Sequence, residues 1–102
     1  MKKFIAERRL LYSSKGGDDR KELVVRIGIP YIVEEGTVNF PIDGIVAGCH
    51  LEFEGLSDES QEIYGVDTLQ AINIASDIES DLKRLEKKYD LYWANGEPYF
   101  GE

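Results

Sequence analysis

At 102 residues, 42% of them hydrophobic, the chain has the size of one domain (residues 1–102) and enough apolar side chains for one core. Its formal net charge of −8 repels a phosphate backbone, which disfavours nucleic-acid binding, and no apolar run is long enough to span a membrane. Glu7 interrupts the basic start of the chain before the apolar region of a signal peptide develops, and Cys49 has no second cysteine to pair with. We therefore expect a single-domain cytoplasmic protein without a disulfide.

Two strands joined by a hairpin loop are predicted in the first third of the chain. Residues 4–12 mix apolar and charged side chains in an imperfect alternation, which predicts a strand with two partly covered faces or with a bulge. Residues 13–21 are turn formers and charged residues, which predict the loop. Apolar residues then recur at every second position and indicate the clearest strand, which Pro30 should end: Leu23, Val25, Ile27 and Ile29.

The middle of the chain is predicted to be a loop followed by a third strand. Residues 34–44 contain two turn signals, with Val38, Phe40 and Ile42 as packing points or as a short irregular strand. Residues 45–54 alternate between two faces. The face expected in the core carries Ala47, Cys49, Leu51 and Phe53, and the face expected to meet solvent or a partner carries Gly48, His50, Glu52 and Glu54.

One long helix is predicted from about Val66 to Lys88, with Val66 directed toward the core. Asp67 is placed to cap its first turn, and Gln70 to return a hydrogen bond as in a capping box. Its apolar stripe contains Leu69, Ile72, Ala75, Ile78, Leu82, Leu85 and Tyr89. Residues 91–94 predict a last short strand before an Asn-Gly turn. This order predicts an α+β fold in which an antiparallel sheet of about four strands packs on one long helix, in two layers.

Few residues in the sequence suit catalysis or metal binding. His50 is the only histidine, and its neighbour Cys49 should point to the opposite face of the strand, so the two cannot easily share a metal or a proton. The acidic pairs lack the spaced ligand series of a calcium loop. We expect no catalytic residue, no metal and no cofactor, with Cys49 buried and unreactive and His50 exposed.

Two groups of residues are candidates for binding a partner. An acidic series runs from the third strand into the loop that follows and could form one negative edge for a basic protein, although a solvated strand face and loop is the simpler explanation: Glu52, Glu54, Asp58, Glu59 and Glu62. An aromatic set close to the C-terminus includes Trp93 as a candidate interface anchor, or else it packs under the helix: Tyr89, Tyr92, Trp93, Tyr99 and Phe100.

Two short motifs resemble those of a family of small uncharacterised bacterial proteins. These motifs are Ile-Ala-Glu-Arg at residues 5–8 and Gly-Val-Asp-x-x-Gln-Ala at residues 65–71. The resemblance implies a bacterial origin and no established catalytic residues. It also implies the company of other small acidic bacterial proteins, among which immunity proteins that neutralise toxins are common.

These features favour a non-enzymatic acidic binding protein, most concretely an immunity-type protein that occludes a basic toxin or nuclease. One alternative is a homo-oligomeric structural or regulatory module, which the aromatic tail and a bare strand edge at Ile29-Pro30 would support. Another is a small carboxylate-based enzyme or ligand binder that uses His50. A deep pocket lined by these groups would favour the last alternative.

Overall fold

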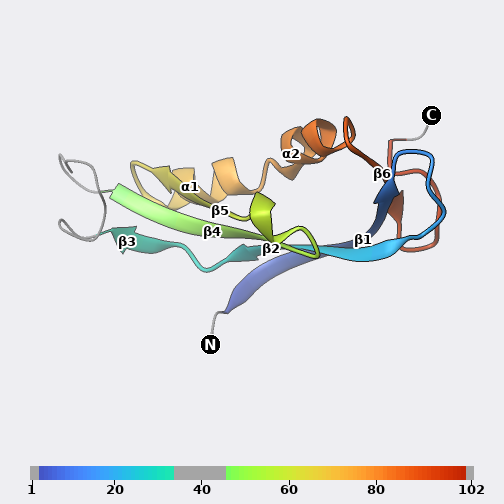
Figure 1. The fold of residues 1–102 in the computed structure, drawn as a ribbon. Helices are drawn as coiled ribbons and strands as arrows, with labels where there is room; N and C mark the ends of the chain where they lie inside the picture. The colour runs from blue at the N-terminus through green and yellow to red at the C-terminus, as the bar shows by residue number, and fades with distance from the viewer. Residues whose placement is uncertain (1–2, 34–45, 101–102) are drawn as a thin grey trace.

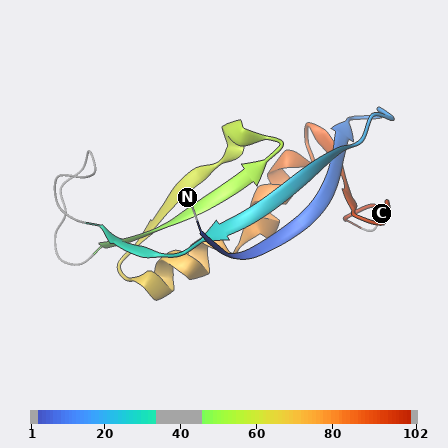
Figure 2. The same ribbon diagram turned by 90° about the horizontal axis from the view of Figure 1, so that it is seen from below.

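Six antiparallel strands form one sheet in the computed structural model, which describes residues 3–33 and 46–100 (Figure 1). The strands are β1 (Phe4–Ser14), β2 (Lys21–Gly28), β3 (Tyr31–Val33), β4 (Val46–Glu54), β5 (Gln61–Gly65) and β6 (Tyr89–Trp93). A 3-10 turn, η1 (Ser57–Glu59), follows β4, and the helices α1 (Thr68–Ala75) and α2 (Ile78–Leu85) connect β5 to β6. Both helices lie on the same face of the sheet (Figures 1 and 2), so the fold is α+β, as predicted.

The strand β4 lies inside the sheet and pairs along both of its edges. β2 and β3 follow one another along one edge, where they pair with residues 51–54 and 46–48, and β5 pairs along the other edge. Pro30 separates β2 from β3, because its nitrogen cannot donate a hydrogen bond to the ladder. β1 pairs with β2 on one side and with β6 on the other. Each face of the sheet therefore brings together side chains from strands that are far apart in the sequence.

The structure contains the predicted strands and two that the sequence analysis missed. The register of β1 against β2 shifts between Phe4 and Ala6, in line with the bulge that was one of the two expectations for this strand. β3 has only three residues, and β5 carries polar residues on both faces, so neither has the apolar alternation that indicates a strand. The prediction of about four strands was therefore too low. The predicted loop at residues 34–44, with Val38, Phe40 and Ile42, lies outside the described residues.

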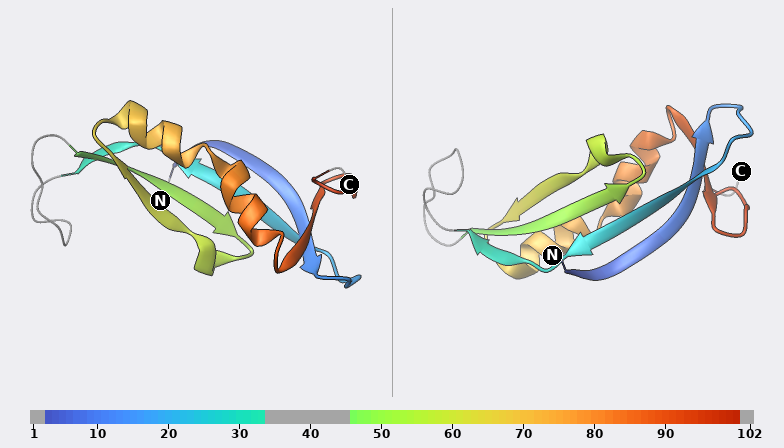
Figure 3. Two further views of the ribbon diagram at one scale, coloured as in Figure 1. Left: turned by 90° about the horizontal axis from the view of Figure 1, so that it is seen from above. Right: turned by 60° about the horizontal axis from the view of Figure 1, so that its bottom comes forward.

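The predicted long helix is instead two helices that meet at a bend. Asp77 has the non-helical backbone angles φ −79° and ψ 57°. The Ser76 hydroxyl donates to the Asn73 carbonyl at 3.0 Å, and the Asp77 carboxylate accepts from the Ser80 hydroxyl at 3.0 Å. Such local bonds compete with the helical ladder, which explains the break. The bend places α1 over β4 and β5, while α2 crosses toward β1 (Figure 3).

The helices bury one face of the sheet in two clusters. The larger joins α2 to the middle strands and contains Leu10, Leu23, Val25, Leu51, Phe53, Ile78, Leu82, Leu85, Leu91 and Tyr99. The smaller lies under α1 and contains Ala47, Cys49, Ala71 and Ala75. The small alanine side chains let α1 approach β4 closely. All four β4 residues predicted to lie in the core are buried, as expected.

Two apolar residues at the start of α1 are exposed, contrary to the prediction. Leu69 is 75% exposed, and Val66 is exposed as well. α1 contacts the sheet through Ala71 and Ala75, and Leu69 lies about 200° around the helix from Ala71 at 3.6 residues per turn. The part of the predicted apolar stripe that contains Leu69 therefore does not face the sheet, and α1 itself ends after eight residues.

The predicted cap of the helix start is confirmed. The Asp67 carboxylate accepts a hydrogen bond from the backbone nitrogen of Gln70 at 2.8 Å. The Gln70 side chain accepts from the backbone nitrogen of Val66 at 2.7 Å, one residue before the position that a capping box would use. These bonds stabilise the first turn of α1 and its junction with β5.

Candidate functional site

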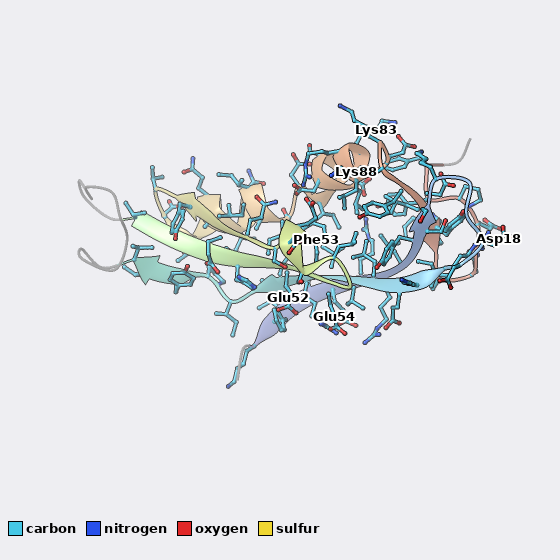
Figure 4. All side chains as sticks on the ribbon, viewed as in Figure 1. Asp18, Glu52, Phe53, Glu54, Lys83 and Lys88 are labelled. Atoms are coloured by element: carbon cyan, nitrogen blue, oxygen red, sulfur yellow. The ribbon has the colours of Figure 1, made fainter. Side chains whose placement is uncertain are left out.

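The face of the sheet opposite the helices, here called the uncovered face, carries most of the charged strand residues. Along β4, Phe53 points toward the helices, whereas Glu52 and Glu54 point away from them (Figure 4). Residues directly opposite one another on paired strands share a face. Arg26 pairs in register with Glu7 on β1 and with Glu52 on β4, so three strands contribute charges to one row.

Arg26 is the centre of the charges on this face. Its Nε donates to Glu7 at 3.1 Å, and its Nη1 contacts Glu52 at 3.3 Å and also bonds to Glu54. The hydrogen bonds to Glu54 and Glu7 raise the pKa of Arg26. The hydrogen bonds that Glu7 accepts from Arg26 and, to a smaller extent, from Arg9 lower the pKa of Glu7. These hydrogen bonds hold positively and negatively charged side chains in fixed positions on the sheet.

Arg9 extends the charged row along β1 and β2. It pairs with Glu7 at 2.9 Å and with Glu22 at 3.4 Å. Val24 lies between Arg9 and Glu54 in register and is buried, although it belongs to the uncovered face. Long charged side chains commonly cover apolar surface in this way. The charged residues therefore also shield the sheet from water.

At the other end of β4, His50 and Tyr31 hold Glu62. The His50 Nδ1 lies 2.5 Å from one Glu62 oxygen, and the Tyr31 hydroxyl donates to the other oxygen at 2.5 Å. The His50 Nε2 lies 3.8 Å from Glu52, which links this group to Arg26. Together these residues form the face network: Glu7, Arg9, Glu22, Arg26, Tyr31, His50, Glu52, Glu54 and Glu62.

The prediction of an exposed His50 was wrong, since its side chain is only 18% exposed. The ring lies between the carboxylates of Glu52 and Glu62, and the start of the side chain lies close to β2. A Cβ atom at Gly28 would lie 3.3 Å from the His50 Cβ atom. The alternation of β4 assigned His50 to the correct face, but it could not show that neighbouring strands fill that face with side chains.

The close approach of Tyr31 to Gly48 explains how a β3 residue reaches β5. A Cβ atom at Gly48 would lie 2.6 Å from the Tyr31 ring, so the ring occupies the space of a β4 side chain. Burial, followed by the hydrogen bond to Glu62, raises the pKa of Tyr31. Its hydroxyl therefore remains a donor to Glu62 at neutral pH.

The predicted acidic series does not form one edge. Glu52, Glu54 and Glu62 belong to the face network, whereas Glu59 pairs with Arg84 of α2 at 2.6 Å. Asp58 lies exposed in η1. Five members of the network were missed because they come from other strands: Glu7, Arg9, Glu22, Arg26 and Tyr31. The alternation of side chains along β1 and along β2 could have been used to assign four of them to this face: Glu7, Arg9, Glu22 and Arg26.

Trp93 lies away from the face network, at the end of the sheet where the C-terminal segment packs. Its ring centroid is 4.5 Å from that of Tyr99, and the Arg8 guanidinium lies 5.5 Å from it. Tyr99 is buried, and its backbone nitrogen donates to the Leu91 carbonyl at 2.9 Å. Of the two interpretations of the aromatic set, these contacts favour internal packing of Tyr99, while Trp93 remains exposed.

A pocket of about 240 Å³ opens between β1 and the bend of the helices. Its floor includes Val25 and Ile27, and its rim includes Arg8 and Glu79, whose side chains pair at 2.8 Å. His50 is not among its lining residues. The pocket therefore does not bring together the carboxylates and histidine that the enzyme alternative requires.

Three further observations concern metal ions, the cysteine thiol and membrane-spanning helices. Within residues 3–33 and 46–100, no three His, Cys, Asp or Glu side chains are arranged to hold a metal ion. Burial raises the pKa of the Cys49 thiol, which donates to the Gly28 carbonyl at 3.3 Å, in line with the predicted buried cysteine. Neither helix in the described part of the chain has the length and apolar character needed to cross a bilayer.

Comparisons with known proteins provide no evidence about this site. No protein-family model matches the chain, and no curated protein and no solved structure matches it either. The resemblance to small bacterial proteins through residues 5–8 and 65–71 therefore stays a prediction.

Proposed function

We propose that this chain is a non-enzymatic binding protein whose uncovered face receives a basic protein partner. The observation that carries the proposal is the charge of the face network. It contains five carboxylates, Glu7, Glu22, Glu52, Glu54 and Glu62, against the two guanidinium groups of Arg9 and Arg26. His50 adds a positive charge only when it is protonated.

The arrangement of the network supports binding in two ways. The helices occupy the other face, so a broad sheet surface is open to a partner (Figure 1). The charged side chains already hold one another in place, so less side-chain conformational entropy is lost when a partner binds. An excess of negative charge on such a surface would also accelerate the approach of a basic protein.

The concrete form of this proposal is an immunity-type protein in the cytoplasm of a bacterium, where it occludes a basic toxin or nuclease. This form rests on the resemblance of residues 5–8 and 65–71 together with the acidic face. The gene beside that of an immunity protein usually encodes its toxin, so the basic products of neighbouring genes are the partners to test first.

The test compares two double variants that remove the same charge from different places. Glu54→Gln/Glu62→Gln changes the uncovered face, and Glu86→Gln/Glu97→Gln changes α2's end and the C-terminal turn. We expect the first variant to slow association with the basic partner by about tenfold at low salt and the second by less than about twofold. Equal slowing by both variants, or no complex with any co-expressed basic neighbour, would contradict the proposal.

A second candidate function, homo-oligomerisation, is favoured by the free edge of β3. Within the described residues, β3 pairs only with β4, and Ile29 and Ile32 beside this edge are exposed. An unpaired strand edge can pair with the same edge of a second copy. Sedimentation equilibrium should then give twice the mass of 11.6 kDa, and Ile32→Lys should restore the monomer. A monomer at all concentrations would exclude this function.

A further inference from the structure

Glu62 differs from the other four carboxylates of the face network in the groups that hold it. Glu7, Glu22, Glu52 and Glu54 each pair with Arg9 or Arg26. Among the residues that the structure describes, no lysine or arginine pairs with Glu62, whose partners are the Tyr31 hydroxyl and the His50 ring. Glu62 is therefore the one carboxylate of the network that no guanidinium group of the described residues pairs with.

Two tyrosines lie on the same face of the sheet as this carboxylate, Tyr31 on β3 and Tyr64 two residues further along β5. Tyr31 and Tyr64 both pair in register with Gly48, so the three residues form one row across β3, β4 and β5 on the uncovered face. Glycine contributes no side chain between the two tyrosines. Tyr31 is 41% exposed and Tyr64 is 37% exposed, so part of each tyrosine is accessible on this face, although the Tyr31 ring also packs over Gly48.

A guanidinium group matches this combination of groups better than other cations do. It is planar, so it stacks on a tyrosine ring while its edge donates to a carboxylate. Each Glu62 oxygen already accepts or shares one hydrogen bond, but a carboxylate oxygen has a second lone pair for another donor. A lysine ammonium could pair with the carboxylate, but it lacks the flat face that stacks on the rings.

We propose that Glu62, with Tyr31 and Tyr64 on the same face, is the point at which the uncovered face binds an arginine side chain of its partner. This inference rests on the proposed function and assigns the strongest contact of that surface. Tyr31 is a positioning residue as well as a stacking surface, since its hydroxyl holds one Glu62 oxygen in place. The Arg26 end of the network would then contribute orientation and repulsion of the wrong partners.

In the experiment, a capped pentapeptide that contains two arginines separated by glycines is added stepwise to the protein. Binding is monitored through the NMR signals of the backbone amides and the tyrosine rings. The control peptides replace arginine with lysine or with neutral citrulline, which has nearly the same shape. We expect saturable shifts at Tyr31, Glu62 and Tyr64 with the arginine peptide, several-fold weaker binding of the lysine peptide and no binding of the citrulline peptide.

Matched variants locate the contact. Glu62→Gln should weaken arginine-peptide binding by about tenfold, whereas Glu54→Gln, whose carboxylate already pairs with Arg26, should weaken it by less than about twofold. Tyr64→Leu should weaken binding by about threefold and Tyr64→Phe should not, because the phenylalanine ring still stacks. Unchanged amide spectra elsewhere would show that each variant is folded.

The possible failures of this inference and of the proposed function are distinguishable. If the peptide shifts the uncovered face but Glu62→Gln and Glu54→Gln weaken binding equally, or if the lysine peptide binds as tightly as the arginine peptide, the arginine site at Glu62 is wrong and the acidic docking face remains. If no residue of the uncovered face responds to any cationic peptide, both proposals are wrong.

Discussion

The two faces of the same sheet are built by different physical rules. On the covered face, Leu51 and Phe53 of β4 are buried against helices by contacts that need only apolar side chains of suitable size. On the uncovered face, the alternate residues Glu52 and Glu54 make directional bonds to Arg26 on another strand. Alternate residues of β4 therefore stabilise the fold on one face and present charges on the other.

The largest effect should come from breaking the covered face. Phe53→Ala removes a fully buried ring from the larger cluster, and we expect it to lower the free energy of unfolding by about 3–5 kcal/mol. Glu54→Ala, one residue away on the uncovered face, should cost far less, because exposed ion pairs contribute little. Urea unfolding of the two variants would contradict the comparison of the faces if their losses were similar.

A smaller effect is expected where the uncovered face is tightly packed. Gly48→Ala places a methyl group 2.6 Å from the Tyr31 ring, which must move and release Glu62. We expect a loss of about 1–3 kcal/mol and a return of the Tyr31 pKa toward its ordinary value, since burial and the Glu62 bond that raise it would both weaken. Ultraviolet titration of the tyrosines measures this change. A tyrosine that still titrates at unusually high pH in the Gly48→Ala variant would contradict the prediction.

The helix caps extend the comparison to the two helices above the covered face. The Asp67 carboxylate caps α1, whereas Asp77 makes no side-chain cap bond at the start of α2. Asp67→Ala should therefore cost about 1 kcal/mol and Asp77→Ala distinctly less. Thermal unfolding measures both. Equal losses would show that the bond from Asp67 to Gln70 contributes nothing specific to α1.

The smallest effect concerns the pH dependence of the uncovered face. Arg26 and Arg9 lower the pKa of Glu7 from its ordinary 4.5, so the unfolded chain takes up this proton at a higher pH than the folded chain. The stability that Glu7 contributes is therefore present above pH 4.5 and is lost as the pH falls through the lower pKa of the folded state.

Glu7→Gln provides the measurement for this pH dependence. Urea midpoints of the wild type and the variant should differ at about pH 6, and the difference should shrink as the pH falls below 4.5 and through the lowered pKa of Glu7 in the folded state. A difference that stays constant across this range would mean that the Arg26 and Arg9 bonds do not favour the ionised Glu7.

The sequence predicts the covered face better than the uncovered face for a physical reason. Burial follows the alternation within one strand, so Leu51 and Phe53 could be assigned to the core without knowing which strand lies next to β4. The bonds of Arg26 to Glu54 and of Tyr31 to Glu62 join residues 28 and 31 positions apart. Predicting them requires the strand order and the register, and no local pattern supplies either.

The strand missed at the sheet edge has the same cause, whereas the break between the two helices was missed for a different one. Ser76 and Asp77 interrupt an apolar spacing that by itself predicts one continuous helix, because their hydrogen bonds depend on the local backbone rather than on hydrophobicity. β5 exists because β4 offers it a free edge, although its own residues are mixed in polarity. Asp67, by contrast, was predictable because a cap is a local interaction.

The most direct test of the acidic docking face is to map where a basic partner contacts the folded chain. Amide chemical shifts would be recorded at low salt as the basic partner protein is added. We predict that the largest changes fall on Arg26, His50 and Glu62, on the uncovered face. Largest changes at Lys83 and Lys87 of the helical region, with the uncovered face unaffected, would contradict the claim that this face is the binding surface.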